Sequence, residues 1–96
     1  MRLDFSPFVE SDIEAIADYI GEDNPTRSVT FVDELWEEMR KVGRDPMHYR
    51  IRPEYGKDAR MAVVGRYVIL FRIMQNTVRI ERIVYGGRDL PALFLP

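Results

Sequence analysis

The segment that most constrains this chain lies in its second half, where two apolar, β-branched runs flank a short polar break. The first run spans residues 66–73 and the second spans residues 77–85, with Met74-Gln75-Asn76 between them. Valine, isoleucine, tyrosine and phenylalanine fit a pleated sheet surface, and a short polar break between two such runs is typical of a hairpin. The pattern therefore predicts two antiparallel strands joined by a loop of about three or four residues.

Alternation along the first run predicts a central strand. Both of its faces are apolar, one through Ile69, Phe71 and Ile73 and the other through Val68 and Leu70. Apolar residues on both faces indicate a strand that is covered on both sides. A shorter strand is expected before it, with one face formed by Ala59, Met61 and Val63. Gly65 bends the chain between the two strands.

The second run is expected to divide into two faces in the same way, with charged residues intruding. One face is formed by Val78, Ile80 and Val84, interrupted by Arg82, and the other by Arg79, Glu81, Ile83 and Tyr85. Arg72 intrudes likewise on an apolar face of the first run. Because a buried arginine is costly unless it is paired, we expect Arg72 and Arg82 at the sheet rim or with their stems along apolar neighbours.

The first helix is expected to run from Pro7 to Gly21. Ser6-Pro7 is a start signal, because serine caps free amides and proline is tolerated at the first helical position. The apolar positions that follow keep a helical spacing, namely Val9, Ile13, Ile16 and Ile20. Ser11 and Glu14 match a capping box inside this stripe, which we interpret as a decoy. The acidic residues off the stripe are expected to face water: Asp12, Glu14, Asp18 and Glu22.

A strand precedes this helix and a second helix follows it. Leu3 and Phe5 alternate with polar neighbours, as in a short half-buried strand. Asn24-Pro25 repeats the start signal, so the second helix should run from Pro25 to Val42, with Gly43 as its left-handed closing residue. The short connection makes the two helices antiparallel, and their apolar sides need the sheet for burial.

The segment from Arg44 to Lys57 is expected to be a loop, because it holds two prolines and a glycine among residues of mixed polarity. His48 is the only histidine, and a lone loop histidine is commonly a plain surface residue, so we give it no role. Loops on a rigid scaffold often carry binding function. The more interesting feature is therefore the basic cluster of Arg50, Arg52, Lys57 and Arg60.

Composition and charge limit the class of protein. The 96 residues suffice for one domain, so residues 1–96 are expected to form a single unit. The absence of cysteine excludes disulfides and Cys-based zinc sites, which suits a reducing cytosol. No apolar run approaches the ~20 residues of a membrane span, and residues 2–7 lack the character of a secretory leader.

Charge is distributed unevenly along the chain. Residues 1–45 carry twelve acidic and five basic residues, whereas residues 46–96 carry nine basic and four acidic ones. The asymmetry predicts either that the two faces meet different partners or that they attract each other within the fold.

The sequence contains none of the common catalytic or metal-binding motifs. It has no glycine-rich phosphate loop, no Ser-His-Asp order, no HExxH and no paired cysteines. Gly86-Gly87 follows the last expected strand and leads into Arg88-Asp89 rather than a useful helix. We therefore expect no catalytic residue, no metal and no cofactor. The residues alone indicate a soluble α+β domain with a basic sheet half.

Six short strings, in order along nearly the whole chain, resemble the toxins of the ParE/RelE superfamily, and within it the ParE branch. They are Phe5-Ser6-Pro7; Ile16-Ala17-Asp18-Tyr19-Ile20 with Glu22-Asp23-Asn24-Pro25; Phe31-Val32-Asp33-Glu34-Leu35; Arg52-Pro53-Glu54-Tyr55-Gly56; Val64-Gly65-Arg66-Tyr67-Val68-Ile69; and Gly86-Gly87-Arg88-Asp89-Leu90-Pro91-Ala92-Leu93-Phe94. No single string is specific, so their order and spacing carry the resemblance. The fold it implies is α+β, with a short N-terminal strand, an antiparallel helical hairpin, a three-stranded antiparallel sheet and a small C-terminal arm.

The resemblance implies one of two activities. ParE-like toxins poison DNA gyrase as protein binders, whereas RelE-like toxins are ribosome-dependent mRNA endonucleases that use arginines, lysines and often a C-terminal tyrosine. At the nuclease positions this chain has Met61, Val63, Val68 and Phe94, and only Arg88 remains. Loss of the base and most cations should cost several orders of magnitude in rate. We therefore expect a non-enzymatic gyrase inhibitor, with a RelE-type nuclease or a non-toxic antitoxin-binding homologue as alternatives.

The resemblance also implies a neutralising partner, a ParD-like ribbon–helix–helix antitoxin whose C-terminal segment folds onto the toxin. Aromatic and arginine anchors dominate binding energetics, so the candidate antitoxin contacts are Tyr19, Trp36, Arg60, Arg66 and Arg72. The candidate target contacts lie in the terminal arm, at Arg88, Asp89, Leu93 and Phe94. Two alternatives stay open. Trp36 is then a residue of the core, and the apolar residues of the arm only cap the core. The toxin is expected in the cytoplasm, with no membrane contact and no direct nucleic-acid binding of its own.

Overall fold

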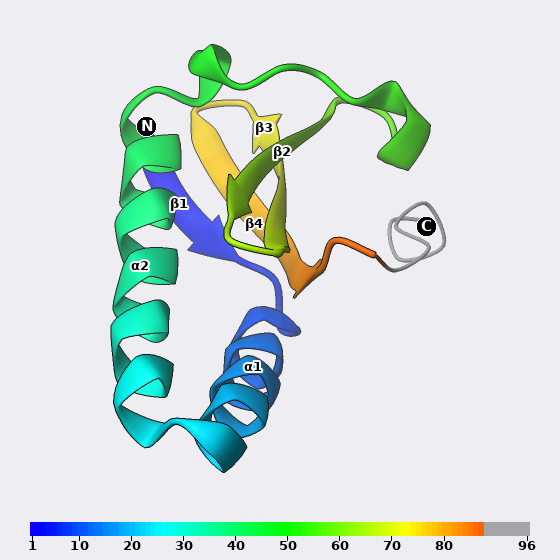
Figure 1. Cartoon of the computed structure of the whole chain (residues 1–96). Coiled ribbons are helices and arrows are strands. Elements are labelled where there is room, and N and C mark those ends of the chain that lie inside the picture. The colour runs from blue at the N-terminus through cyan, green and yellow to red at the C-terminus, as the bar shows by residue number, and fades with distance from the viewer. Residues whose placement is uncertain (88–96) are drawn as a thin grey trace.

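The fold is built on a mixed sheet of four strands, with two helices packed against one of its faces (Figure 1). The structure is a computed structural model, and it describes residues 1–87. Its α-helices and strands are β1 (Arg2–Phe5), α1 (Val9–Asp23), α2 (Pro25–Arg44), β2 (Ala59–Val64), β3 (Tyr67–Met74) and β4 (Thr77–Tyr85). The segment predicted as a loop before β2 also contains two short 3-10 helices, η1 (Pro46–His48) and η2 (Pro53–Tyr55). The predicted order of strand, helical hairpin and three-stranded antiparallel sheet is confirmed. The predicted terminal arm lies outside the described residues.

β1 joins the sheet beside the last strand, which the sequence pattern did not specify. The strand order is β1-β4-β3-β2, and β1 runs parallel to β4 while the other neighbours are antiparallel. Leu3 lies opposite Val78 and Phe5 lies opposite Ile80. A parallel neighbour requires a crossover connection, and the helical hairpin forms part of it. β4 therefore has strand neighbours on both sides along its first half.

The turn between β3 and β4 is shorter than expected. Met74 pairs with Thr77, so only Gln75 and Asn76 form the loop, and the prediction of three or four residues is wrong. Gln75 takes the left-handed backbone conformation, with φ at 57°. Two-residue hairpin turns adopt a positive φ at this position because it matches the twist of the flanking strands.

A bulge in β4 corrects the predicted division of its faces. The register shifts between Leu70 and Phe71, which leaves Glu81 as an extra residue in β4. Beyond the bulge the side chains alternate in the opposite sense, so Ile83 joins the core under the helices and Val84 lies on the other face. The prediction for these two residues is wrong, because alternation along the sequence assumes an unbroken ladder.

Both faces of the sheet carry buried apolar side chains. The core under the helices contains Val9, Ile16, Phe31, Leu35, Met39, Val42, Ala62, Ile69, Phe71, Val78, Ile80 and Ile83. A smaller cluster on the opposite face contains Ala59, Val68, Leu70 and Val84. Because β3 contributes to both clusters, its prediction as a central strand is confirmed.

α1 begins and ends slightly later than predicted. It runs from Val9 to Asp23 rather than from Pro7 to Gly21. The helix passes through Ser11, so the interpretation of the capping-box pattern as a decoy is confirmed. The start of α2 follows the prediction, since it begins at Pro25 after a tight break, and the Asn24 side chain accepts a hydrogen bond from a backbone amide of its first turn at 3.0 Å.

Gly43 lies inside α2, so the expectation that it closes the helix is wrong. α2 continues to Arg44, with Asp45 as its capping residue. The glycine serves a close approach instead, because a Cβ at this position would stand 2.9 Å from Leu3 Cγ. β1 can therefore lie against the end of α2, where the amino group of Met1 also donates a hydrogen bond to the Gly43 carbonyl at 3.2 Å.

β4 is longer than β1, and two side chains satisfy the part of its edge that β1 leaves open. Where β1 ends, the Ser6 amide donates to the Ile80 carbonyl at 2.8 Å and the Ser6 hydroxyl donates to the Glu81 carbonyl. Further along, the Ile83 amide donates to Asp12 Oδ2 at 3.0 Å. Ser6 and Asp12 thus continue the hydrogen-bonded edge after the backbone of β1 has left the sheet.

Asp12 was expected to face water, but its side chain is only 10% exposed. Arg82 donates to both of its carboxylate oxygens, through Nε at 2.9 Å and Nη2 at 2.8 Å. The hydrogen bonds that Arg82 donates to Asp12 raise the pKa of its guanidinium. The prediction for Asp12 is wrong because the apolar stripe marks only the side of α1 that faces the core. It does not reveal that another side of the helix, which carries Asp12, contacts the edge of the sheet. The other acidic residues off the stripe are exposed as predicted, namely Glu14, Asp18 and Glu22.

Replacing Asp12 with alanine should destabilise the fold strongly. The change removes the acceptor of both the Arg82 guanidinium and the Ile83 amide, and breaking a mostly buried ion pair costs about 3 kcal/mol. Urea unfolding at neutral pH measures the loss. Asp18→Ala removes an exposed carboxylate from the same helix and should change the free energy of unfolding by less than about 0.5 kcal/mol. Equal losses in the two variants would contradict the role assigned to Asp12.

Two glycine-to-alanine changes should act in opposite directions. Gly65 takes φ at 57° in the β2–β3 turn, and a Cβ there would lie 3.3 Å from the Phe31 ring. Gly65→Ala should therefore destabilise the fold by about 1 kcal/mol or more. Gly21 lies inside α1, where a Cβ would meet Ser28 at an ordinary 3.7 Å, so Gly21→Ala should stabilise it by about 0.5–1 kcal/mol. Thermal unfolding compares the two, and a more stable Gly65→Ala variant would refute the turn geometry.

Candidate binding surfaces

A pocket lined by tyrosines lies where the β2–β3 turn meets the end of α1. Its volume is about 410 Å³, and its walls are formed by Tyr19, Ile20, Arg66, Tyr67 and Tyr85. α1 supplies the first two of these residues, the turn supplies the arginine, and β3 and β4 supply the remaining tyrosines. We call this site the tyrosine pocket.

The local backbone positions the sheet side of the tyrosine pocket. Gly65 and Arg66 form a two-residue turn between β2 and β3. Tyr67 lies opposite Tyr85, and their rings meet edge to face with centroids 5.8 Å apart. One residue further, the Gly86 amide donates a hydrogen bond to the Arg66 carbonyl at 2.8 Å, which holds the end of β4 against the turn.

The tyrosine pocket combines apolar walls with available polar groups. The Tyr67 ring packs 5.5 Å from that of Phe31, and burial raises the pKa of its hydroxyl. Tyr19 is 68% exposed. Arg66 is exposed and forms no ion pair with any of residues 1–87. Aromatic rings beside a guanidinium are the residue types that anchor protein–protein contacts.

The five residues predicted to bind an antitoxin do not form one surface. Tyr19 and Arg66 lie together in the tyrosine pocket. Arg60 donates a hydrogen bond to a backbone carbonyl of the loop before β2, and Arg72 lies 3.6 Å from a glutamate carboxylate of β4 with 29% of its side chain exposed. Trp36 lines a different pocket. The four predicted target contacts lie outside the described residues, at Arg88, Asp89, Leu93 and Phe94.

Sequence reasoning did not find Tyr67 and Tyr85 as site residues. The feature that could have identified them is their position, because Tyr67 begins β3 and Tyr85 ends β4, so the two residues face each other across the open end of the hairpin. The match depends on the short turn and on the bulge together, because a bulge-free hairpin closed by the same turn would place Tyr67 opposite Val84. Neither feature follows from the alternation of apolar residues, so the pair could not be deduced from the pattern.

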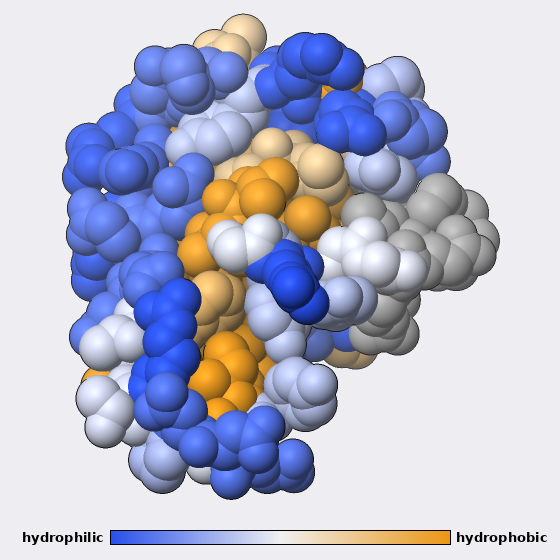
Figure 2. All heavy atoms as spheres, in the orientation of Figure 1, coloured by the Kyte–Doolittle hydropathy of each residue, from blue (hydrophilic) through white to orange (hydrophobic). Residues whose placement is uncertain are grey.

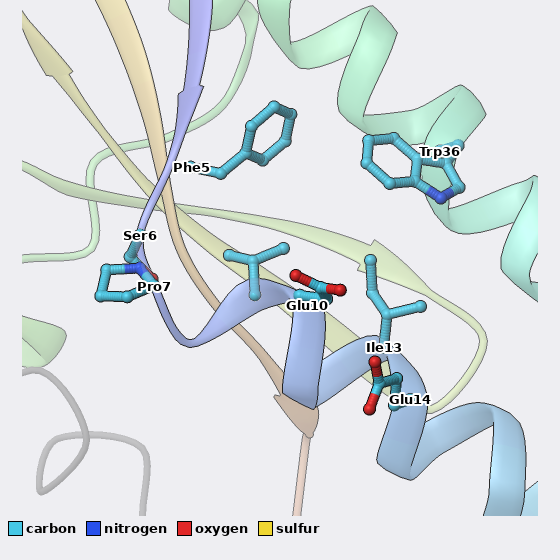
Figure 3. Close-up of a pocket in the computed structure, with 8 residues that line it drawn as sticks. Phe5, Ser6, Pro7, Glu10, Ile13, Glu14 and Trp36 are labelled. Atoms are coloured by element: carbon cyan, nitrogen blue, oxygen red, sulfur yellow. The ribbon is translucent and has the colours of Figure 1, made fainter.

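A second pocket opens between α1, α2 and the end of β1 (Figure 3). Its volume is about 460 Å³, and it is lined by Phe5, Ser6, Pro7, Val9, Glu10, Ile13, Glu14 and Trp36. The Phe5 and Trp36 rings meet edge to face with centroids 5.6 Å apart. Trp36 is 36% exposed and so is not a residue of the buried core. We call this site the hairpin pocket.

The loop before β2 holds its polar side chains in local contacts. Tyr49 donates a hydrogen bond to Glu38 at 2.7 Å, and burial, followed by this bond, raises the pKa of Tyr49 to about 12. His48 is exposed and packs edge-on against the Tyr49 ring. Arg52 of the predicted basic cluster is paired with Glu54 at 2.9 Å. Within residues 1–87, no three histidine, cysteine or acidic side chains gather as metal ligands would.

The positions compared with RelE-type nucleases carry apolar side chains in the described part of the chain. Val68 is 6% exposed within the cluster on the sheet face away from the helices. Met61 packs against the same cluster. Val63 is 58% exposed on β2. The fourth position, Phe94, lies outside the described residues.

β2 is an edge strand, and Val63 is its exposed apolar residue. It stands at the end of the sheet, and apart from a bridge between Ile51 and Arg60, its outer backbone edge pairs with no other segment within residues 1–87. Figure 2 shows apolar side chains gathered at the centre of the view, beside the hydrophilic outer surface of α2. An apolar edge of this kind can accept a further strand from another chain.

None of the helices described in residues 1–87 is both long and apolar enough to cross a membrane.

Comparison with known proteins shows relatives by sequence family and by fold. The family model for the ParE toxin of the type II toxin–antitoxin system, parDE, matches residues 3–90. Among solved structures, the chain is similar to one described as the chromosomal ParDE TA system from P. aeruginosa, with a TM-score of 0.79 and 19% sequence identity. The match covers 88% of this chain and 95% of that one. No curated protein sequence matches the chain.

Proposed function

This chain belongs to the ParE toxin family of type II toxin–antitoxin systems, and we propose that it inhibits DNA gyrase by binding the enzyme, without catalysis of its own. The observation that supports the proposal is the apolar character of Met61, Val63 and Val68, at positions where the family resemblance leads one to expect the cations of a RelE-type nuclease. Apolar side chains supply no charge to stabilise a phosphodiester in its transition state. The proposed place of action is the cytoplasm, where gyrase acts on DNA.

A ParD-like ribbon–helix–helix antitoxin neutralises the toxin, in this proposal, by covering the tyrosine pocket. The Arg66 guanidinium complements an acidic side chain, and the exposed rings of Tyr19 and Tyr85 offer apolar contact. The edge of β2 runs directly into the turn that carries Arg66. The same antitoxin segment can therefore pair with β2 as an added strand and continue into the pocket.

In a supercoiling assay, micromolar concentrations of the purified chain should inhibit gyrase and accumulate cleaved DNA. Cleaved DNA is expected because a poison traps the covalent intermediate instead of merely blocking substrate. The preformed complex with the antitoxin is the control and should leave supercoiling intact. If gyrase stays fully active at micromolar concentrations of the toxin, this proposal is wrong.

Two other results would redirect the function. Cleavage of messages in a translation extract, lost on Arg88→Ala, would restore the nuclease alternative. Normal growth of a bacterial host that makes the folded chain alone would favour a homologue that binds antitoxin without being toxic.

Tyr19→Ala and Arg66→Ala should weaken antitoxin binding without weakening the fold. Both side chains are exposed, so the free energy of unfolding should change by less than about 0.5 kcal/mol. Truncating an interface anchor costs about 2 kcal/mol, or roughly thirtyfold in Kd. Titration calorimetry and urea unfolding measure the two effects. Arg40→Ala changes an exposed arginine of α2 outside the pocket and should bind like the unmodified chain. Equal affinity in all three variants would exclude the pocket as the antitoxin site.

A further inference from the structure

The hairpin pocket has an apolar floor and a partly exposed aromatic wall. On α1, Val9 is buried and Ile13 is half-buried, while Phe5 and Trp36 stay 37% and 36% exposed. In Figure 3, Phe5 from β1, Trp36 from α2 and Ile13 from α1 converge on one space. A hollow with this lining fits one bulky apolar side chain from another molecule.

The rim of the hairpin pocket is acidic. Glu10 and Glu14 lie one turn apart on α1, are both exposed, and form no ion pair with any of residues 1–87. Arg40, one turn after Trp36, is already paired with a glutamate of α2 at 3.0 Å. The apolar walls therefore stand within a negative field.

We propose that the hairpin pocket docks a cationic amphipathic segment of the toxin's protein target. One bulky apolar side chain of that segment enters between Phe5, Ile13 and Trp36, and lysines or arginines beside it pair with Glu10 and Glu14. The inference rests on the proposed function, because enzymes that handle DNA carry basic surface segments that neutralise its phosphates. An acidic pocket with apolar walls complements such a segment in charge and in shape.

Charge separates this occupant from two others. A second copy of the chain, related by a two-fold axis, would bring two acidic rims together, which opposes association. The antitoxin is assigned to the tyrosine pocket, which shares no lining residue with the hairpin pocket and carries an arginine in place of carboxylates.

Trp36 is the single tryptophan of the chain, so its fluorescence reports directly on the hairpin pocket. The probe is a tryptophan-free helical peptide of about five turns, with leucine and phenylalanine along one face and lysine along the other. Its twin carries glutamate in place of lysine. The lysine peptide should change Trp36 emission saturably, with an affinity that falls as salt rises, and the twin should leave emission unchanged. An equal response to both peptides, or no saturable response to either, overturns the proposal.

Charge-removing variants test the rim itself. Glu10→Gln combined with Glu14→Gln should weaken binding of the lysine peptide by about tenfold and flatten its salt dependence. Asp18→Asn combined with Glu22→Gln removes the same charge from the same helix outside the pocket, and should bind like the unmodified chain. All four side chains are exposed, so both double variants should fold, which circular dichroism verifies. If the two double variants bind the peptide equally, the proposal fails.

The gyrase assay distinguishes this inference from the proposed function. About tenfold more of the Glu10→Gln, Glu14→Gln variant should be needed to inhibit supercoiling, because a tenfold weaker affinity for the target raises the inhibitory concentration by the same factor. The Asp18→Asn, Glu22→Gln control should inhibit like the unmodified chain. If both double variants inhibit like the unmodified chain, docking through the hairpin pocket is refuted while the gyrase proposal stands. If the unmodified chain does not inhibit gyrase, the gyrase proposal fails and the peptide titration decides on the pocket.

Discussion

The fold depends on how the open edge of β4 is closed. β1 covers only the first part of that edge, and beyond it the strand would leave backbone groups unpaired. Ser6 binds the Glu81 carbonyl and Asp12 binds the Ile83 amide. Because Asp12 lies on α1 and also holds Arg82, these contacts fix the first turns of the helix against the sheet. The hairpin pocket is built on the same turns, so its shape depends on the contacts that complete the sheet.

The bulge at Glu81 also affects both the core and a surface pocket. It turns Ile83 into the core under the helices and places Val84 on the opposite face. The same shift of one residue sets Tyr67 opposite Tyr85, which forms the sheet wall of the tyrosine pocket. One extra residue in β4 therefore couples the packing of the core to the shape of a surface suited to a partner. Bulges commonly re-aim side chains in this way.

Uneven charge along the sequence left two interpretations open, and the structure contains features of both. Asp12 with Arg82, and Asp4 with Arg79 at 3.6 Å, join the acidic first half of the chain to the basic second half. Other charges of each half stay exposed, with Glu10 at the hairpin pocket and Arg66 at the tyrosine pocket. The proposed binding function uses both kinds of charge, because some charges join the two halves of the chain while others remain available to partners of opposite sign.

The sequence by itself determined the order of the elements, the two helices and the central place of β3, because these follow from local periodicity and turn signals. It also singled out Tyr19 and Arg66 as candidate binding residues from their chemistry, and both line the tyrosine pocket. Only the tertiary structure decided the parallel pairing of β1, the division of the β4 faces and the burial of Asp12. The Asp12–Arg82 pair joins residues 70 positions apart. The periodicity of apolar residues indicates which side chains prefer burial. It does not indicate which distant backbone groups still need hydrogen-bond partners, and those groups determined the strand register and the shape of the pockets.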